Sequence, residues 1–484
     1  MFAANLIGYL MGFLFTIFIT RRLSEEEFGI WALVGSYITY SLMPFDLVGS
    51  WISRDAARGK KILSSAAALF ALLTPISLII YFSMALGSAS VINYDPWTMA
   101  LGVMILIPYI LLNLGTAIQS GYAPQNLGVA RIFFEISKVI IAFYLVVILR
   151  MGLIGAFVSL SIAYLIQATL LLQKSTQLFQ NRVSRRLVTK WLKGAPINII
   201  QIADRILNVT DIILMSVITG QAIIAGYWQA AVTASALVAS SSILMSGLGP
   251  RLISGGTQKD LDKVFDFTMT FTIPMLFGFM VLSRDILWIL RPTYSSGWVA
   301  ACFLALAGVV GTIGNFGTVS VLGMDKFDQK DELSIREYLT SKIFTLNKLN
   351  LAVTALYIAS ISIYLLIFGR ACIVKLVTEI AGVNLLFAII RAIMNLKLMR
   401  RFTELKLNLE NIPHYLIAST IMAVAVYACR ASFPPLSGSV FKVAPLILAL
   451  VALGAVVYGV TLYALSQNFR TFVREIRYYL YSLR

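Results

Sequence analysis

Charged side chains are scarce in this sequence, and histidine and cysteine are almost absent. Of its 484 residues, only 13% are Asp, Glu, Lys or Arg, one is His and three are Cys. Soluble domains are about 25% charged, so this composition excludes a water-soluble globular protein. The cysteines lie in or beside apolar segments without metal-like spacing, which predicts neither a metal site nor a disulfide framework.

Catalytic and nucleotide-binding motifs are also missing. No GxxxxGK[ST] sequence occurs, so a built-in ATPase is not expected. A membrane glycosyltransferase or sugar polymerase would need acidic residues on a sizeable outer loop, but the 87–96 loop carries a single acid, Asp95. We therefore do not expect an enzyme. The net charge of +17 comes from basic residues scattered over short loops. Basic loop residues set the topology of membrane proteins and contact anionic lipid headgroups, so this charge does not predict a nucleic-acid partner.

Long apolar runs are what the sequence does contain. Hydrophobic residues make up 59% of the chain, and a bilayer-spanning helix needs about 20 apolar residues. This predicts an all-α, polytopic membrane protein with about fourteen transmembrane helices. The spans are expected near 2–20, 30–50, 62–86, 97–118, 131–149, 151–173, 196–219, 221–247, 264–290, 295–322, 349–369, 371–395, 412–432 and 443–467.

Loop charges predict the orientation of these spans. If the N-terminus is cytoplasmic, most of the 39 Lys and Arg residues fall in cytoplasmic loops, which is the bias seen in membrane proteins generally. We expect a multi-pass protein of the cell (plasma) membrane with both termini cytoplasmic. The first apolar run lacks a basic leader and a cleavage site, so it is expected to be a retained span.

The two halves of the chain repeat a pattern. Gly29 and Gly226 each begin a Gly–(Ile/Tyr)–Trp run at the start of a span, and the same interval separates Arg54 from Arg251 at the end of that span. Six predicted spans fill each period, so the halves have the same orientation and are related by a pseudo-two-fold axis along the membrane normal. We expect two six-helix lobes followed by two C-terminal helices.

The repeat predicts how the chain is divided. The N-lobe covers 1–173 and the C-lobe covers 196–395. Between them, 174–195 is a basic, amphipathic cytoplasmic linker that is expected to rest on lipid headgroups. The two C-terminal spans occupy 396–468, and a basic cytoplasmic tail covers 469–484.

The seventh predicted span, Pro196–Thr219, carries charges at bilayer depth. Such charges cost several kcal/mol and normally face a protein interior or a watery cavity. Arg205 points about 100° away from its neighbour on a helix, so it is expected to bind a partner on another helix, or a phosphate. The polar face predicts either the lining of a transport path or a buried lock between helices. On a continuous helix it spans roughly 120° and contains Gln201, Asp204, Arg205, Asn208 and Asp211.

Other charged residues complete the predicted site. Lys138 is the second deep cation, and Glu135 one turn away offers it a local ion pair. Arg54 and Arg251, at equivalent inner ends of spans two and eight, are expected either to form a cytoplasmic gate or headgroup-capture site, or only to set topology. Asp46 in span two is expected to pair with one of these cations or to cap a helix.

A family resemblance rests on the residues that follow span one. The run from Arg22 to Leu33, RLSEEEFGIWAL, resembles the R-L-G-x-x-E-F-G-x-Y-A-L signature of prokaryotic polysaccharide flippases. Downstream, Asp46–Gly49 and Ile52–Arg54 resemble that family's D-x-G and x-S-R steps. These flippases belong to the multidrug/oligosaccharidyl-lipid/polysaccharide (MOP) exporter superfamily. The chain departs from the pattern at Ser24, where the family usually has Gly, and in starting almost inside span one.

The resemblance implies an alternating-access transporter with a central cavity between the lobes. Its cargo would be an isoprenoid-pyrophosphate-linked oligosaccharide or polysaccharide precursor, flipped from the cytoplasmic to the outer leaflet by a monomeric unit among membrane lipids. Arg205 and Lys138 are the expected phosphate-binding cations. The alternative is a multidrug antiporter of the same superfamily that uses Asp204 and Asp211 as proton or Na⁺ sites. No cofactor is expected beyond a coupling proton or Na⁺.

Overall fold

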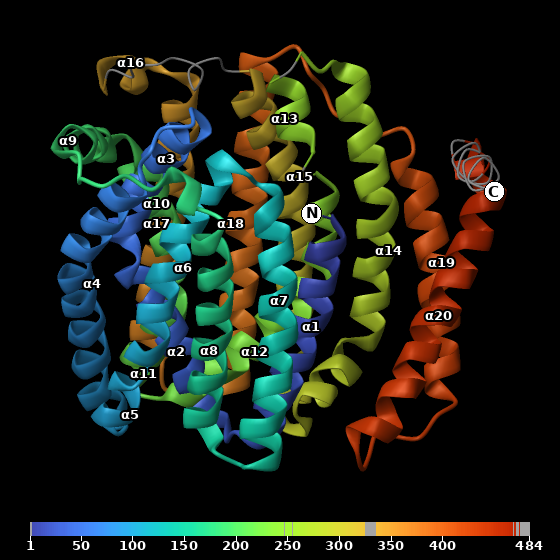
Figure 1. Ribbon diagram of the computed structural model, residues 1–484. Coiled ribbons are helices and arrows are strands. Elements are labelled where there is room, and N and C mark those ends of the chain that lie inside the picture. Colours follow the sequence, from blue (N-terminus) through green and yellow to red (C-terminus); the bar gives the residue numbers. More distant parts are fainter. Residues whose placement is uncertain are drawn as a thin grey trace, which may run out of the picture. The chain divides into compact units, whose positions relative to one another are not determined.

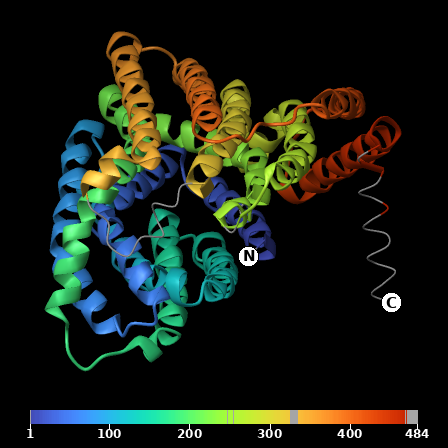
Figure 2. The same cartoon turned by 90° about the horizontal axis from the view of Figure 1, so that it is seen from above.

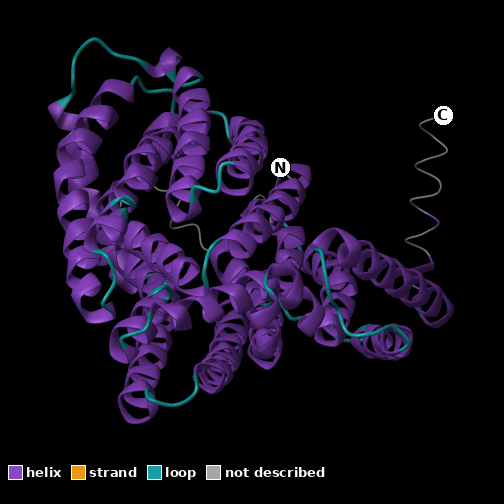
Figure 3. Ribbon diagram, turned by 90° about the horizontal axis from the view of Figure 1, so that it is seen from below, coloured by secondary structure: helices purple, strands orange, loops and turns teal. Residues whose placement is uncertain are grey.

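The computed structural model is helical throughout the part of the chain that it describes, namely 2–245, 247–253, 255–324, 335–467, 469–470 and 474. No strand occurs in these residues, and turns and loops connect the helices (Figure 3). The all-α prediction is confirmed. The predicted basic tail, 469–484, lies almost entirely outside the described residues.

Packing divides the chain into two compact units. Unit 1 comprises Met1–Thr233 and Phe327–Val383, and unit 2 comprises Ala234–Lys326 and Asn384–Arg484. These units are not the predicted lobes, whose boundaries and symmetry stay a prediction. Two helices contribute to both units, namely α12 (Ala222–Ala239) and α18 (Ile373–Phe402).

Unit 1 holds the helices of the first half of the chain together with α16 and α17 from the second half (Figure 1). Its helices are α1 (Phe2–Arg22), α2 (Glu25–Ser41), α3 (Met43–Ala57), α4 (Leu63–Ile92), α5 (Pro96–Ala100), α6 (Val103–Tyr122), α7 (Gln125–Ala142), the π-helix η1 (Phe143–Ile148), α8 (Gly152–Gln173), η2 (Thr176–Leu178), α9 (Arg185–Gly194), η3 (Ala195–Asn198), α10 (Ile199–Leu207), α11 (Thr210–Thr219), α16 (Ile335–Thr340) and α17 (Lys342–Phe368).

Unit 2 is built around the longest helix, α14, which packs against α19 and α20 (Figure 2). The Tyr458 hydroxyl of α20 donates to the Thr270 carbonyl of α14 at 2.8 Å. Arg430 of α19 donates to both Asp285 oxygens of α14, at 2.7 and 3.0 Å. The helices of this unit are η4 (Ser240–Met245), α13 (Leu248–Ile253), α14 (Gln258–Leu290), η5 (Pro292–Gly297), α15 (Trp298–Met324), α19 (Ile412–Ala431) and α20 (Val440–Leu465).

Ten helical segments of the described chain are long and apolar enough to cross a membrane, or eleven if the bent pair α2–α3 counts as one span. They coincide with all but three of the predicted spans. Spans one, five and seven are helical but do not meet this criterion. Spans five and seven each contain three charged residues. The chain is therefore a multi-pass membrane protein, and the count of fourteen spans stays a prediction.

Span two is not the single straight helix that its hydropathy predicts. It runs from Glu25 to Ala57 and bends by 53° between α2 and α3. Leu42 lies at the bend, and Pro44 stands in the first turn of α3, where the missing N–H of proline costs no hydrogen bond. The bend divides the span into a first half, α2, and a second half, α3.

Close helix packing in unit 1 depends on glycine. α6 packs against α3, α4 and α8, and a Cβ on Gly115 of α6 would lie 2.9 Å from Leu171 Cβ of α8. A Cβ on Gly29 of α2 would lie only 1.9 Å from the Ala222 carbonyl oxygen. Gly29 begins the motif that repeats in the sequence, so direct contact between backbones explains the glycine there.

A buried carboxylate docks α9 of the linker onto α3. The Asp55 side chain, only 1% exposed, accepts hydrogen bonds from Lys60 Nζ at 2.7 Å, Lys190 Nζ at 3.0 Å and Trp191 Nε1 at 2.9 Å. Trp191 is fully buried. The Trp191 side of α9 therefore packs on protein, and contact of its exposed basic side with lipid headgroups stays a prediction.

Candidate functional site

Predicted span seven is not one continuous helix, which corrects the basis of the 120° arc. η3, α10 and α11 follow one another, with Asn208–Val209 between the last two. The Asn208 side chain donates to the Asp204 carbonyl at 2.7 Å, and the Asp211 carboxylate accepts from the Ile212 N–H at 2.7 Å. Such bonds compete with regular helix pairing, which explains the break. Discontinuous helices at membrane depth line binding sites in transporters.

The break lies beside the bend of span two. The hydroxyls of Tyr40, at the end of α2, and Thr210, at the start of α11, are 2.5 Å apart. Arg205 Nη1 of α10 lies 2.8 Å from Asp46 Oδ2 of α3, and these side chains are 55% and 20% exposed. Asn113 of α6 donates to the other Asp46 oxygen at 3.2 Å. Three helices thus meet at one carboxylate, and Arg205 has its partner on another helix, as the angular argument predicts.

Asp204 and Asp211 both face α17. The Thr354 hydroxyl donates to the Asp204 carboxylate, and the Tyr357 hydroxyl donates to Asp211 Oδ2 at 3.2 Å. Asp211 is buried. One turn before Thr354, the amide oxygen of Asn350 is buried without a hydrogen-bond partner in the described structure. The carboxylates are therefore held by hydroxyl groups on one side of α17.

The two uncharged residues of the predicted face lie on the surface. Gln201 and Asn208 are both exposed. The Asn208 side chain donates to the Asp204 carbonyl oxygen at the end of α10. Neither residue adds a side-chain contact to the Asp46–Arg205 pair.

Lys138 and Glu135 form a second cluster on α7. Lys138 Nζ lies 2.6 Å from Glu135 Oε2, and the side chains are 9% and 5% exposed. Arg131 Nε lies 3.8 Å from the other Glu135 oxygen. The Lys138 ammonium also lies over the rings of Phe15 and Phe134, at 5.1 and 4.7 Å. The local ion pair is therefore present, and it encloses Lys138 instead of offering it to a ligand.

Stacked aromatic rings extend from the second cluster towards the first. Phe134 of α7 stacks on Tyr164 of α8 at 4.9 Å, and Tyr164 stacks on Tyr109 of α6 at 4.6 Å, each pair within 9° of parallel. Sequence reasoning missed these rings and Asn113. The sequence does contain a pattern that indicates them: polar residues recur at positions i, i+4, i+7 and i+11, which places them on one side of α6. It comprises Tyr109, Asn113, Thr116 and Ser120, here called the α6 polar stripe.

The two predicted gate arginines belong to different units, and each has a local contact. The Arg54 guanidinium lies 4.8 Å from the centre of the Trp51 ring in unit 1. Arg251 Nε lies 2.7 Å from Asp260 Oδ1 in unit 2. A gate formed by both arginines stays a prediction.

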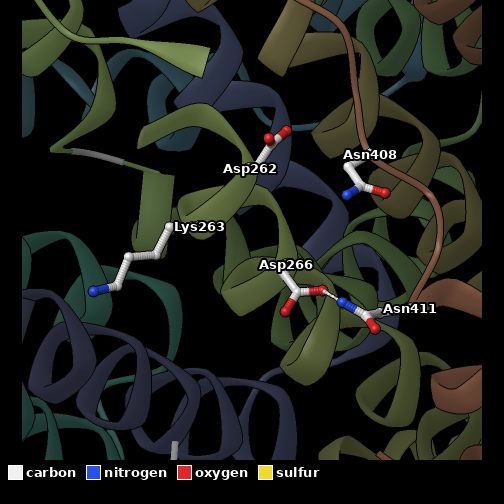
Figure 4. Close-up of a pocket in the computed structure, with 5 residues that line it drawn as sticks. All are labelled: Asp262, Lys263, Asp266, Asn408 and Asn411. Atoms are coloured by element: carbon white, nitrogen blue, oxygen red, sulfur yellow. Dashed lines mark hydrogen bonds between the residues drawn. The ribbon is translucent and has the colours of Figure 1, made fainter. Parts of the chain in front are cut away.

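A hollow of about 200 Å³ opens at the start of α14 in unit 2, where sequence reasoning placed no site (Figure 4). Asn411 donates to Asp266 Oδ1 at 2.9 Å, and Figure 4 shows Lys263 pointing away from this pair. The lining combines two acids and a lysine from α14 with two amides from the segment before α19. It comprises Asp262, Lys263, Asp266, Asn408 and Asn411.

The acid of the 87–96 loop has a structural role. Asp95 caps α5 by accepting hydrogen bonds from the hydroxyl and N–H of Thr98, at 2.6 and 2.9 Å. These hydrogen bonds hold the pKa of Asp95 below its usual range. Within the described residues, no group of three or more His, Cys, Asp and Glu side chains could hold a metal ion.

Several solved structures share this fold. The lipid II flippase MurJ, in an inward closed conformation, is similar over 98% of each chain, with a TM-score of 0.60 and 15% identity. An inward-facing MATE family multidrug transporter of the MOP superfamily is similar over 82% of this chain and 95% of its own, with a TM-score of 0.57 and 11% identity. The eukaryotic MATE transporter AtDTX14 is similar over 83% of this chain and 96% of its own, with a TM-score of 0.51 and 14% identity.

Sequence comparison adds nothing to this likeness. No family model matches the chain, and no curated protein matches its sequence. At these identities, the likeness concerns the fold. The chain shares the fold of these MOP superfamily transporters, which is the fold that the resemblance of the sequence motif implies.

Proposed function

We propose that the protein flips an isoprenoid-pyrophosphate-linked oligosaccharide or polysaccharide precursor from the cytoplasmic to the outer leaflet. The observation that carries this proposal is Arg205, a cation within predicted span seven whose side chain is 55% exposed. A guanidinium has five N–H donors suited to phosphate oxygens, and Asp46 accepts from Nη1. An anionic headgroup gains from this cation, whereas a cationic drug is repelled by it. The similar fold of a lipid II flippase supports a lipid-linked cargo.

Asp46 gives the empty site a built-in anion. The cargo phosphate and the Asp46 carboxylate compete for the same guanidinium, so binding loosens the contact between α3 and α10. This couples cargo binding to a change in helix packing, which alternating access requires. Asp46→Asn is therefore expected to bind the pyrophosphate lipid more tightly than wild type and to release it more slowly.

Translocation of a lipid-linked oligosaccharide in proteoliposomes tests the proposal. Wild type should flip the lipid, Arg205→Ala should flip it at least tenfold more slowly, and Arg205→Lys should keep part of the rate because the charge remains but the fork is lost. Lys193→Ala, which removes an exposed cation of α9, is the matched control and should behave as wild type. Normal flipping by Arg205→Ala would contradict an anion-binding role.

A cation-coupled drug antiporter is the second candidate, because Asp204 and Asp211 lie together against α17. A half-buried carboxylate, Asp204, and a buried one, Asp211, each with a hydroxyl neighbour, suit a proton or Na⁺. In the same proteoliposomes, a protein that flips no lipid but exchanges a cationic dye for protons, and loses this exchange in Asp204→Asn, would replace our first proposal. A protein that flips lipid should instead lose only its dependence on the ion gradient in Asp204→Asn.

A further inference from the structure

α6 has an exposed apolar face and, on its opposite side, a partly exposed polar face. One face is apolar, and its side chains Met104, Ile107 and Leu111 are 41%, 49% and 39% exposed. The α6 polar stripe is centred about 170° away from that face and falls within an arc of roughly 60°. Its first three members are half-buried and Ser120 is exposed. An exposed apolar face at bilayer depth suits lipid, whereas an exposed polar one requires water or a polar ligand.

The stripe has hydrogen-bonding capacity to spare. Asn113 donates to Asp46, which ties the stripe to the cation site at Arg205. The hydroxyls of Tyr109, Thr116 and Tyr164 have no hydrogen-bond partner among the described residues. The stacked rings fix the positions of the two phenols. The stripe itself contains no charged side chain.

We propose that the α6 polar stripe, together with Tyr164, binds the hydroxyl-rich sugar part of the cargo while Arg205 binds its phosphate. The inference rests on the proposed function and assigns a subsite within it. Phenol, hydroxyl and amide groups both donate and accept hydrogen bonds, as sugar hydroxyls do. The stripe extends about 16 Å along α6, which leaves room for more than one sugar ring next to the phosphate.

Binding of paired ligands to the purified full-length protein tests the subsite. The probes are a short-chain isoprenoid pyrophosphate and its counterparts that carry glucose, galactose or N-acetylglucosamine. The variants are Tyr109→Phe, Tyr164→Phe and Thr116→Val, which keep side-chain size and ring stacking. Tyr144→Phe, at an exposed position of η1, is the matched control. Thermal denaturation of each variant checks that the fold is kept.

Wild type should bind at least one sugar-bearing lipid more tightly than the sugar-free one. Each stripe variant should lose roughly three- to tenfold in affinity for that lipid, as expected for one hydrogen bond, and should bind the sugar-free lipid as wild type does. Equal affinity of wild type for all probes, or unchanged sugar-dependent binding in the variants, would overturn the subsite and leave water as the occupant of the stripe.

Failure of the proposed function gives a different pattern. In that case wild type binds none of the pyrophosphate lipids, or Arg205→Ala binds them as well as wild type does. The subsite then falls together with the function on which it rests. Loss of affinity for both sugar-bearing and sugar-free lipids in Tyr109→Phe, with the fold intact, would instead assign Tyr109 to the phosphate site and overturn the division of roles.

Discussion

The Glu135–Lys138 and Asp46–Arg205 pairs of unit 1 contain the same charges in opposite surroundings. The first joins two side chains of one helix that are 5% and 9% exposed. The second joins two helices through side chains that are 20% and 55% exposed. A buried charge that loses its partner is costly, whereas solvent screens an exposed pair and leaves it little net stability. Burial therefore separates a pair that holds the fold from one that is free to exchange its partner.

Breaking the buried pair tests the first half of this comparison and should have the largest effect on stability. Glu135→Gln leaves Lys138 in an apolar environment without a carboxylate, so the free energy of unfolding should fall by about 3–5 kcal/mol. The measurement is denaturant-induced unfolding in detergent micelles. The double variant Glu135→Gln/Lys138→Met should recover most of the loss, and a single variant as stable as wild type would contradict the assigned role.

Arg430 and Asp285 provide an intermediate case in unit 2, with side chains that are 16% and 10% exposed. Arg430→Gln removes both hydrogen bonds to the carboxylate and should destabilise the protein by about 2 kcal/mol. Arg430→Lys keeps the charge but loses the fork, so its loss should be smaller. If Arg430→Gln lowers the free energy of unfolding as much as Glu135→Gln does, the contribution of these ion pairs to stability does not follow their burial.

Transport and stability should separate at the exposed pair. Arg205→Gln should lower the unfolding free energy by less than about 1 kcal/mol while reducing lipid flipping at least tenfold. The exchanged variant Asp46→Arg/Arg205→Asp should keep the stability but not the transport, because the cation then projects from α3. Restored transport in the exchanged variant would mean that only the pairing matters, and not where its cation lies.

The smallest effect is expected at Arg251, whose side chain is 64% exposed beside Asp260. Arg251→Gln should change the unfolding free energy by less than about 0.5 kcal/mol, and added salt should remove the difference. Asp260→Ala should cost more than Arg251→Gln, because Asp260 also completes the capping box at Thr257. Equal effects of the two substitutions would show that the ion pair, and not the cap, is what Asp260 provides.

Hydropathy and local spacing predicted much of the fold and one of the two charge clusters. Apolar runs located the helices because lipid selects for long apolar segments. The i, i+3 spacing of Glu135 and Lys138 offered their ion pair directly. Proline in the sequence MPF also marked the bend of span two, although the prediction did not use it.

Tertiary packing decided the rest. Asp46 and Arg205 lie 159 residues apart in the sequence, so their pairing follows from how α3 and α10 cross and not from any local pattern. The break at Asn208 depends on side-chain bonds to the backbone that a regular helix model leaves out. Tyr109 and Tyr164 were missed because aromatic residues are common in apolar segments, and only their stacking and exposure set them apart.

The pairing of Asp46 with Arg205 also determines how the site responds to the membrane potential. The empty site carries a cation and an anion side by side, so its rearrangement moves no net charge through the electric field. Moving one elementary charge across 100 mV involves about 2.3 kcal/mol. Only the loaded step, in which a phosphate brings its own charge, should therefore respond to voltage. In a variant without the Asp46 charge, the empty site carries the net charge of Arg205, so the return of the empty transporter should also depend on voltage.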